Sequence, residues 1–452
     1  MSNEKRSSFT GSIGFVLAAA GSAVGLGNIW RFPYLAAKYG GGIFLLVYII
    51  LAVTFGFALM TAEITIGRKT GLSAIGAFKK LNKKFSFLGY IAALVPVIIL
   101  PYYSQIGGWV MKYLYTFISG AGAAAASDEF FGGFITATGE PVLWFFLFLA
   151  ATAIIVLFGV EKGIEKVSKV MMPILVILTI IIAGYSVSMP GAWDGVVYYF
   201  KPDFSNFSVT TVLAAMGQLF YSMSLAMGIM ITYGSYMKKE DNIEKSVRNI
   251  EIFDTGIAIL AGLMVIPAVF AFSNGNLENL KAGPSLMFIT LPKVFETMAF
   301  GNLIGGAFFL LVLFAALTSS ISLMETVVSI FCDKLHIERK LSCLLVFVIS
   351  VIIGLASCFG YSIWAEFKII GLQLLDFFDF ISNSVIMPIV AFFTCILVGY
   401  VIKPKAIIEE VEISGKFKAK NLFVVVIKYI APIFIVLILA SSVLSGLGYI
   451  TI

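Results

Sequence analysis

Charged residues are scarce in this chain, and so are the side chains that usually carry acid–base chemistry. Asp, Glu, Lys and Arg make up only 12% of its 452 residues, and the single histidine is His336. Its place in the charged stretch 333–340 predicts a solvated loop residue. We find no nucleophile paired with a base, which covalent catalysis requires. The chain is therefore not expected to be an enzyme.

Cysteine is also rare, and its spacing excludes the usual metal motifs. Cys332, Cys343, Cys358 and Cys395 are far apart and lie in or beside apolar stretches. Isolated cysteines of this kind most simply pack as small apolar side chains. We expect neither a disulfide nor an organic cofactor.

Apolar residues, in contrast, are abundant. They account for 60% of the chain, and the mean hydropathy is +1.01. With about 20 apolar residues needed per span, the sequence predicts an all-α polytopic membrane protein with eleven spans in a single membrane domain, 1–452. The spans are expected near 12–36, 41–66, 87–119, 142–160, 168–188, 208–236, 248–273, 300–332, 342–361, 376–402 and 423–450.

The basic residues in the loops predict the orientation. An N-terminus in the cytoplasm places most of the 31 Lys and Arg residues on that side, including Lys79, Lys80, Lys83 and Lys84. We expect a multi-pass protein of the cell's inner (plasma) membrane whose C-terminus is extracellular. Because the basic residues are spread over separate short loops, the net charge of +6 indicates contact with the lipid bilayer and not with nucleic acid.

Two of the predicted spans are interrupted by polar and glycine residues, at 21–33 and at 217–228. Unwound backbone inside a membrane is tolerated only where it is buried in protein or lines a cavity. The interruptions lie five spans apart, which predicts a 5+5 inverted repeat, 12–188 and 208–402, with 423–450 as an extra helix. A kinked helix whose small residues pack against a neighbour remains the alternative for either interruption alone.

These interruptions belong to a longer series of motifs that resembles the neurotransmitter:sodium symporter family, which has the LeuT-type fold. The motifs are Gly25-Leu-Gly27-Asn28-Ile-Trp-Arg31-Phe-Pro33-Tyr, Gly40-Gly-Gly42, Glu63 with Gly67-Arg68, Tyr102-Tyr103, Gly217-Gln218, Ile231-Thr-Tyr-Gly-Ser-Tyr236, Phe288-Ile-Thr-Leu-Pro292 and Leu317-Thr318-Ser319-Ser320. The resemblance implies secondary active transport, in which an inward sodium gradient drives an amino-acid substrate through one site of alternating access.

The resemblance also implies two sodium sites, and hard cations prefer oxygen ligands. The first would use the Ala23 carbonyl, Asn28, Ser222 and Asp254, completed by the substrate carboxylate. The second would use the Gly21 and Val24 carbonyls, Ala315, Thr318 and Ser319. The alternative is that Ser222, Thr318 and Ser319 only bond back to carbonyls of their own helices. Asp254 has a stronger claim, because charged side chains within membrane helices are rare and usually functional.

Gly25 predicts the substrate class. Monoamine carriers of this family place an aspartate there, so a glycine implies a substrate that brings its own carboxylate, an α-amino acid. By resemblance the pocket would be lined by Ala23, Gly25, Leu26, Gly27, Ile99, Tyr103, Tyr221, Ser222, Ser224, Met227, Ser319 and Leu323. None of these is charged, and the flexible Met227 stands where phenylalanine is frequent. We expect a large hydrophobic or aromatic neutral amino acid.

Asp254 departs from the family pattern, in which this position is commonly asparagine. Animal relatives add a chloride ion beside the first sodium, and a carboxylate here could replace that anion. Tyr48, Gln218 and Ser222 match the chloride-site positions. We therefore expect transport without chloride, while a proton-driven symporter remains an alternative because Asp254 can titrate.

The resemblance further implies gates on both sides of the site. The outer gate would pair Arg31 with Asp379. The inner one would pair Arg6 with Asp333, supported by Tyr236. Glu63 would brace the unwound segments. Gate residues on both faces favour a transporter over the remaining alternative, a membrane amino-acid sensor that does not cycle. We expect a monomer or weak dimer.

Overall fold

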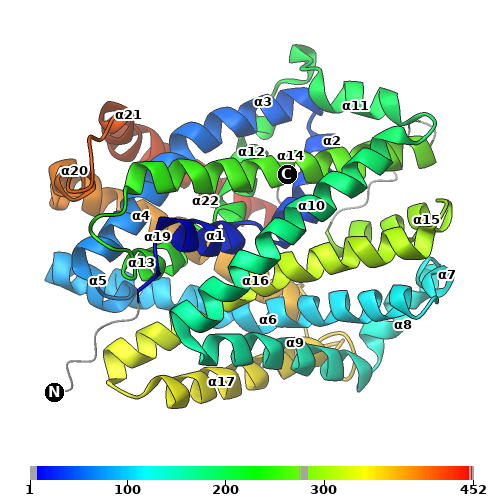
Figure 1. Ribbon diagram of the computed structural model, residues 1–452, viewed down its shortest axis with the longest axis horizontal. Coiled ribbons are helices and arrows are strands. Elements are labelled where there is room, and N and C mark those ends of the chain that lie inside the picture. The colour runs from blue at the N-terminus through cyan, green and yellow to red at the C-terminus, as the bar shows by residue number, and fades with distance from the viewer. Residues whose placement is uncertain (1–7, 274, 276–282, 447–448, 450–452) are drawn as a thin grey trace.

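The computed structural model describes residues 8–273, 275, 283–446 and 449. Its elements are helices that run roughly parallel to one long direction (Figure 1). Among the described residues, nine helices are long and apolar enough to cross a membrane, or ten if the bent pair Ser12–Ala23 and Gly27–Lys38 counts as one span. This confirms the predicted all-α polytopic class.

The first half of the chain contains six of the predicted spans with their connections. In order, its helices are α1 (Ser12–Ala23), η1 (Gly27–Arg31), α2 (Phe32–Lys38), α3 (Gly42–Leu51), η2 (Ala52–Gly56), α4 (Phe57–Thr70), α5 (Ala74–Leu81), η3 (Lys83–Phe85), α6 (Ser86–Ile118), α7 (Gly122–Ala125), α8 (Asp128–Thr136), α9 (Glu140–Leu157), η4 (Val160–Glu165), α10 (Lys166–Ser188), α11 (Ala192–Phe200), η5 (Phe204–Asn206), α12 (Val209–Ser222) and α13 (Ile229–Gly234).

The second half continues with α14 (Ile243–Phe272), η7 (Leu286–Thr290), α15 (Leu291–Glu296), α16 (Gly301–Leu335), α17 (Arg339–Phe359), α18 (Leu374–Asp379), η8 (Phe380–Ile386), α19 (Met387–Ile396), η9 (Leu397–Val401), α20 (Lys403–Glu412), α21 (Lys420–Val425), η10 (Val426–Ile430) and α22 (Ala431–Gly446). Every predicted span therefore falls on helical residues. The sixth does not form one long helix, because it is split into α12 and α13.

The first predicted interruption is a real break. Helix α1 ends at Ala23, Val24 is extended, and the chain resumes as the π-helix η1. The two parts meet at an angle of 55°. Pro33, which has no backbone N–H, lies where η1 passes into α2. The break thus begins where glycine and polar residues enter the apolar run.

The second interruption is a break with a strained backbone. Between α12 and α13, Ser224 has φ 52° and Ala226 has φ 60°. Side chains rarely adopt these left-handed values, and they persist only where the surroundings impose them. Here the buried carboxylate of Glu63 accepts a hydrogen bond from the Ala226 N–H at 2.7 Å. Glu63 therefore braces the unwound segment, as the resemblance implied.

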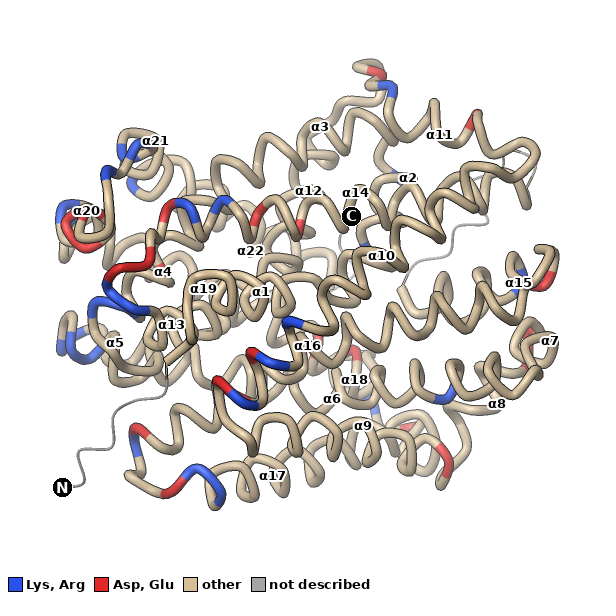
Figure 2. The backbone as a smooth tube through the Cα atoms, in the orientation of Figure 1, with Lys and Arg blue, Asp and Glu red and all other residues tan. Residues whose placement is uncertain are grey.

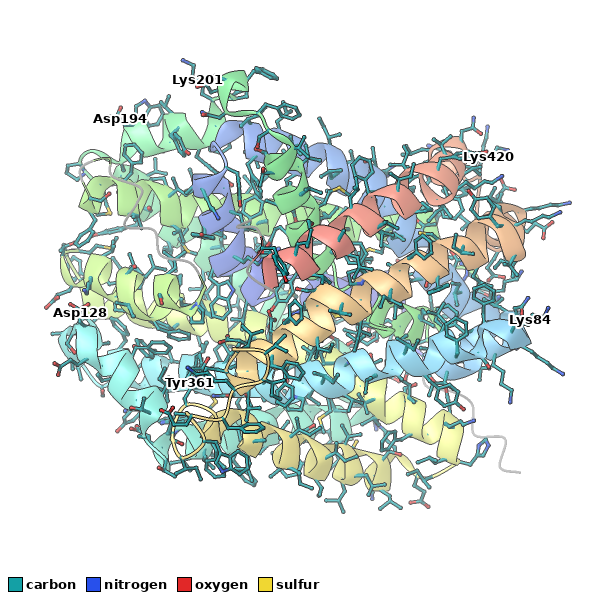
Figure 3. The ribbon with its side chains drawn as sticks, turned by 180° about the vertical axis from the view of Figure 1, so that it is seen from behind. Lys84, Asp128, Asp194, Lys201, Tyr361 and Lys420 are labelled. Atoms are coloured by element: carbon teal, nitrogen blue, oxygen red, sulfur yellow. The ribbon has the colours of Figure 1, made fainter. Side chains whose placement is uncertain are left out.

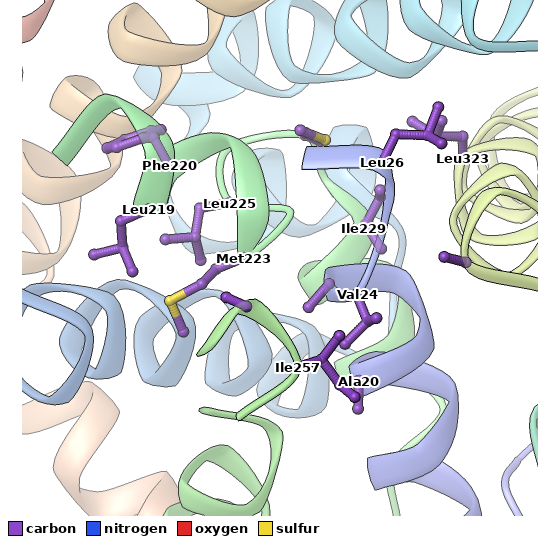
Figure 4. Close-up of a cluster of buried hydrophobic side chains, with 14 of the residues drawn as sticks. Ala20, Val24, Leu26, Leu219, Phe220, Met223, Leu225, Ile229, Ile257 and Leu323 are labelled. Carbon is purple, nitrogen blue, oxygen red and sulfur yellow. The ribbon is translucent and has the colours of Figure 1, made fainter. Parts of the chain in front are cut away.

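The breaks lie inside the bundle, next to tightly packed helices. Position 67 on α4 has no room for a side chain, because a Cβ there would meet the Ile231 carbonyl of α13. Apolar side chains from both breaks, among them Val24, Leu225 and Ile229, form one buried cluster with α12 and α14 (Figure 4). The unwound backbone is thus enclosed by protein, which satisfies the condition for unwinding in a membrane.

The charges gather at the two ends of the bundle. Lys and Arg are concentrated at the end formed by α5, α20 and α21 (Figure 2). Lys84 and Lys420 lie at that end, while Asp128 and Asp194 lie at the opposite one (Figure 3). The loops predicted to share the cytoplasmic side therefore do share one end of the molecule. Which side of the membrane this end faces stays a prediction.

Candidate binding site at the two helix breaks

A buried carboxylate joins the two breaks. Asp254 of α14 is 0% exposed. One of its oxygens, Oδ1, accepts hydrogen bonds from Asn28 Nδ2 and from Ser222 Oγ, each at 2.8 Å. The hydroxyl of Tyr48 donates to Oδ2 at 3.4 Å. Three of the residues predicted for the first sodium site are therefore in direct contact, each from a different helix.

Asn28 also ties the first break to itself. Its Oδ1 accepts a hydrogen bond from the Gly25 N–H at 3.1 Å, while its Nδ2 donates to Asp254. Gln218 of α12 donates to the Gly27 carbonyl at 2.9 Å. Ala23, the fourth residue predicted for this site, lines the cavity described below. The loop is therefore held by amide side chains from its own and a second span.

The residues predicted for the second sodium site meet between α1 and α16. The Ser319 hydroxyl lies 3.1 Å from the Ser22 carbonyl oxygen, 3.4 Å from that of Val24 and 3.5 Å from that of Gly21. Position 21 packs against Thr318, whose side-chain carbon is 3.1 Å from where a Cβ would stand. Carbonyl and hydroxyl oxygens of two helices thus converge here.

The hydroxyl partners test the alternative that these residues bond only to carbonyls of their own helices. Ser222 and Ser319 bond to other helices, so the alternative of bonding only to their own helices is wrong for both. Bonding within its own helix does describe Thr318, whose hydroxyl bonds to the Phe314 carbonyl at 3.0 Å and the Ala315 carbonyl at 3.1 Å. The Thr318 side chain nevertheless packs against Gly21 of α1, while Ala315, the remaining residue predicted for this site, contacts the Thr318 hydroxyl through its carbonyl.

This donor set fits a hard monovalent cation. It consists of carbonyl, hydroxyl and amide oxygens with one carboxylate, which is the chemistry that Na⁺ and other hard cations prefer. Among the residues that the structure describes, no group of three or more His, Cys, Asp or Glu side chains gathers as a metal cluster.

A cavity of about 30 Å³ lies between the two breaks. It is lined by every residue predicted for the substrate pocket, and by Ser22, Asn28 and Ile229 in addition. None of these described residues carries a charge. The volume accommodates only one or two water-sized groups, so an amino acid needs the side chains around it, Tyr103 and Tyr221 among them, to move outward.

Two serines at this site, Ser22 and Ser322, were not predicted from the sequence. Ser22 and Ser322 lie 2.7 Å apart through their hydroxyls, and Ser224 donates to the Ser22 carbonyl at 2.9 Å. Ser322 in turn donates to the Ser319 carbonyl. The available signal was position, since Ser22 precedes the first break and Ser322 lies one turn after Ser319.

The outer-gate residues face a common cavity of about 260 Å³, but they do not form an ion pair in this structure. Its wall includes Arg31, Asp376 and Asp379. The Arg31 guanidinium lies over the Tyr221 ring, 5.4 Å from its centroid. The Asp379 carboxylate accepts hydrogen bonds from Tyr102 at 3.1 Å and from Asn383 at 2.6 Å.

On the inner side, one of the predicted gate residues, Arg6, lies outside the described residues. Its expected partner Asp333 accepts a hydrogen bond from the Ser73 N–H at 2.8 Å. Phe9 is 1% exposed and packs against the rings of Tyr233 and Tyr236. An aromatic cluster therefore packs where the inner gate was predicted.

Tyr236 also contacts a buried ion pair that the sequence analysis overlooked. Its hydroxyl donates to Glu325 at 2.7 Å. Glu325 is 0% exposed and pairs with Arg339 of α17, which also donates to the Val156 carbonyl. The signal was a single carboxylate in the apolar span 300–332. Its partner is on another helix and was not predictable from spacing.

Comparisons with known proteins agree over nearly the whole chain. Residues 6–127 and 131–449 match the Sodium:neurotransmitter symporter family. An uncharacterized sodium-dependent transporter, YhdH, of Bacillus subtilis is 34% identical over 98% of this chain and 99% of its own. An uncharacterized sodium-dependent transporter of Haemophilus influenzae is 32% identical over 97% of this chain and 99% of its own.

A solved structure is similar to the whole fold. The crystal structure of MhsT in complex with L-phenylalanine is 37% identical, with a TM-score of 0.86 over 97% of this chain and 100% of that one. The breaks and the cavity between them therefore lie in a fold that the MhsT structure shares.

Proposed function

Because the chain belongs to the Sodium:neurotransmitter symporter family and is thus a sodium-dependent symporter, we propose that its substrates are large hydrophobic or aromatic α-amino acids and that it needs no chloride. The observation that carries this proposal is the uncharged cavity between the two helix breaks, next to the buried carboxylate of Asp254.

The cavity has a polar and an apolar part. At the polar part, the Leu26 N–H points to the Tyr103 hydroxyl at 3.5 Å. The positive end of a half-helix and free N–H groups favour a carboxylate here. The apolar part is formed by Ile99, Met227 and Leu323. An amino acid with a large neutral side chain matches both parts, and the similar MhsT structure contains L-phenylalanine.

Gly25 supports a substrate that brings its own carboxylate. A Cβ at this position would lie 2.8 Å from Ser319 Oγ and 3.2 Å from the Tyr103 hydroxyl. An acidic side chain therefore does not fit without displacing both. In the absence of such a side chain, the substrate carboxylate can complete the shell of the first sodium ion.

Sodium and substrate would be coupled through the first break. Asn28 and Ser222 lie against Asp254, and the α1 carbonyls lie against Ser319. A cation between them replaces these internal hydrogen bonds by ion contacts and draws α1, α12, α14 and α16 together. Binding of both ions would therefore favour the arrangement in which the substrate is enclosed.

The carboxylate of Asp254 supports independence from chloride. It supplies a fixed negative charge beside the first sodium site, and the hydroxyls of Ser222 and Tyr48 already donate to it. Those are two of the positions that match the chloride site of animal relatives. A chloride ion would meet like charge there, which disfavours its binding.

We extend the proposal to topology. Residues 12–188 and 208–402 would be the two inverted repeats, and the end rich in Lys and Arg would face the cytoplasm. Labelling of single cysteines with a membrane-impermeant reagent tests this. The loop near Lys84 should be protected in intact cells, and a site near Asp128 should be labelled.

Uptake into proteoliposomes tests the function. The purified protein is given a panel of labelled amino acids under an inward Na⁺ gradient, under K⁺, and under a proton gradient alone. We expect Na⁺-dependent accumulation of phenylalanine, leucine, tyrosine or tryptophan, unchanged when gluconate replaces chloride. Binding without accumulation would identify a sensor. Accumulation on protons alone, or a strict need for chloride, would contradict the proposal.

A further inference from the structure

Lys428 is a cation within an apolar span and has no acidic partner. It belongs to η10, inside the membrane-spanning helix Lys420–Gly446. In the part of the chain that the structure describes, no Asp or Glu forms an ion pair with it, and its Nζ lies 5.6 Å from the ring centroids of Tyr400 and Tyr429. Charged residues in membrane helices usually mark a functional contact. We therefore sought a partner outside the chain.

A cavity of about 390 Å³ opens beside this lysine, where η9, α20 and η10 meet. Its wall combines three cations with aromatic and apolar groups: Lys403, Lys405, Lys428, Tyr400, Ile408 and Val424. The Tyr400 hydroxyl donates to the Lys428 carbonyl at 2.5 Å, which fixes the two sides of the cavity to each other. Among the described lining residues none is acidic, so the cavity is positively charged.

The acidic residues of α20 do not neutralise these lysines. Glu410 is 4% exposed and is engaged by Arg68 at 3.0 Å and by Lys239 at 2.5 Å. Glu409 reaches Lys405 at 3.8 Å, and both side chains are largely exposed. An exposed pair of this kind contributes little. Lys403 and Lys428 thus keep their full charge for another ligand.

The backbone at the cavity has an unusual conformation. Lys403 has φ 65°, in the left-handed region that favours glycine. Such residues persist where the surroundings impose them, and they are common at ligand sites. Lys403 is also the first residue of α20, a helix of 10 residues.

The surroundings of the cavity favour an anion that carries apolar chains over a free anion. Val425, Tyr429 and Ile433 are 47%, 56% and 63% exposed on the same span, which places apolar surface in contact with lipid chains. The cavity lies at the end of the bundle where Lys and Arg gather around α20 and α21 (Figure 2). We propose that it binds the phosphate headgroup of an anionic phospholipid, whose acyl chains follow this apolar surface.

Native mass spectrometry of the full-length protein tests the proposal. The protein, in detergent micelles, is mixed with phosphatidylglycerol or with phosphatidylcholine, whose headgroup has no net charge. It is then released from the micelles in the mass spectrometer. We expect one tightly held phosphatidylglycerol, which is lost in the triple variant Lys403→Gln, Lys405→Gln, Lys428→Gln. Each lysine near a membrane surface contributes a similar amount to the free energy of binding anionic lipid. Loss of all three lysines should therefore lower the apparent affinity for phosphatidylglycerol roughly a hundredfold.

A second triple variant, Lys416→Gln, Lys418→Gln, Lys420→Gln, removes the same charge from the neighbouring loop and should keep the bound lipid. Equal loss in both variants would mean diffuse attraction and would overturn the site. Equal retention of phosphatidylcholine, or displacement of the lipid by excess inorganic phosphate, would overturn it as well.

A triple Lys→Arg variant at 403, 405 and 428 keeps the charges and should keep the lipid. Loss of lipid from this variant while its thermal unfolding is unchanged would also contradict the proposal. If the glutamine variant does not fold, Lys428→Gln alone is compared with Lys420→Gln. A smaller loss of bound phosphatidylglycerol in Lys428→Gln than in Lys420→Gln would exclude the cavity as the lipid site.

Discussion

The first helix break, residues 24–26, is held mainly by polar side chains, whereas the second, residues 223–228, has a strained backbone that one buried carboxylate and the Ser224 hydroxyl hold in place. In the first, Asn28 bonds to both Gly25 and Asp254, and Ser319 reaches the α1 carbonyls. In the second, Ala226 has φ 60° and donates to Glu63. A cation can replace polar side-chain contacts, but it cannot replace a strained backbone. The first break therefore suits ion binding, and the second suits a rigid frame.

Removing the carboxylate shared by both breaks should have the largest effect. Asp254→Ala leaves Asn28 and Ser222 without their acceptor and removes the fixed charge at the first sodium site. A buried polar group left without its partner costs about 1–3 kcal/mol, and two such groups are left here. We expect Na⁺-driven uptake to fall by more than roughly a hundredfold in proteoliposomes.

The isosteric variant at the same position separates charge from shape. Asp254→Asn keeps the hydrogen bonds to Ser222 and loses the charge, so residual uptake should become stimulated by chloride. Glu251→Gln, which removes another buried carboxylate of α14 that pairs with Arg248, is the control and should keep uptake independent of chloride. Uptake by Asp254→Asn that ignores chloride would refute the proposed replacement of the anion.

The next effect concerns the frame at the second break. Glu63→Ala leaves the buried Ala226 N–H without its acceptor, which costs about 1–3 kcal/mol. We expect a lower temperature of thermal unfolding and loss of most uptake. Glu63→Gln keeps an acceptor oxygen at the same place and should retain most of both. If alanine and glutamine behaved alike, the role of Glu63 as a hydrogen-bond acceptor would be disproved.

Adding one methyl group should distinguish the crowded first break from helix α12, where Gly217 has room for a side chain. Gly25→Ala places a Cβ 2.8 Å from Ser319 Oγ, whereas at Gly217, in α12, the nearest neighbouring atom is 4.0 Å away. Overpacking costs about 1–3 kcal/mol, so Gly25→Ala should weaken phenylalanine binding by about tenfold or more. Gly217→Ala should leave the dissociation constant nearly unchanged. Equal effects, measured by isothermal titration, would contradict the crowded first break.

Much of this arrangement is visible in the sequence. Both breaks follow from glycine and polar residues within apolar runs, and the spans follow from hydrophobicity. The site residues came from family motifs, and the structure places the predicted substrate residues around one cavity. Features that depend on the local sequence pattern, the helix breaks and the spans, are therefore predictable even in a chain with few charges.

The rest depends on contacts between distant helices. The positive φ values of Ser224 and Ala226 have no signature in residue type, because Glu63 from another span helps to impose them. The same holds for the pairing of Glu325 with Arg339. The predicted outer gate also shows this limit, since the Asp379 carboxylate bonds to Tyr102 of α6 and to Asn383, pairings that no sequence spacing indicates.

The smallest effect concerns neighbouring hydroxyls beside the first break. The Ser319 hydroxyl faces the α1 carbonyls, while that of Thr318 is bonded within its own helix and must turn to reach an ion. One hydrogen bond contributes about 0.5–1.5 kcal/mol. Ser319→Ala should therefore raise the half-saturating Na⁺ concentration roughly threefold to tenfold, and Thr318→Val should raise it less.

Ser320→Ala is the matched control for this pair, because its hydroxyl bonds to Thr152 on the other side of α16. It should leave the Na⁺ dependence of uptake unchanged. A larger shift for Thr318→Val than for Ser319→Ala would mean that the threonine has already turned toward the ion when sodium binds. In that case the carbonyls of the first break would contribute less to ion binding than the hydroxyls of α16, and the contrast between the two breaks would weaken accordingly.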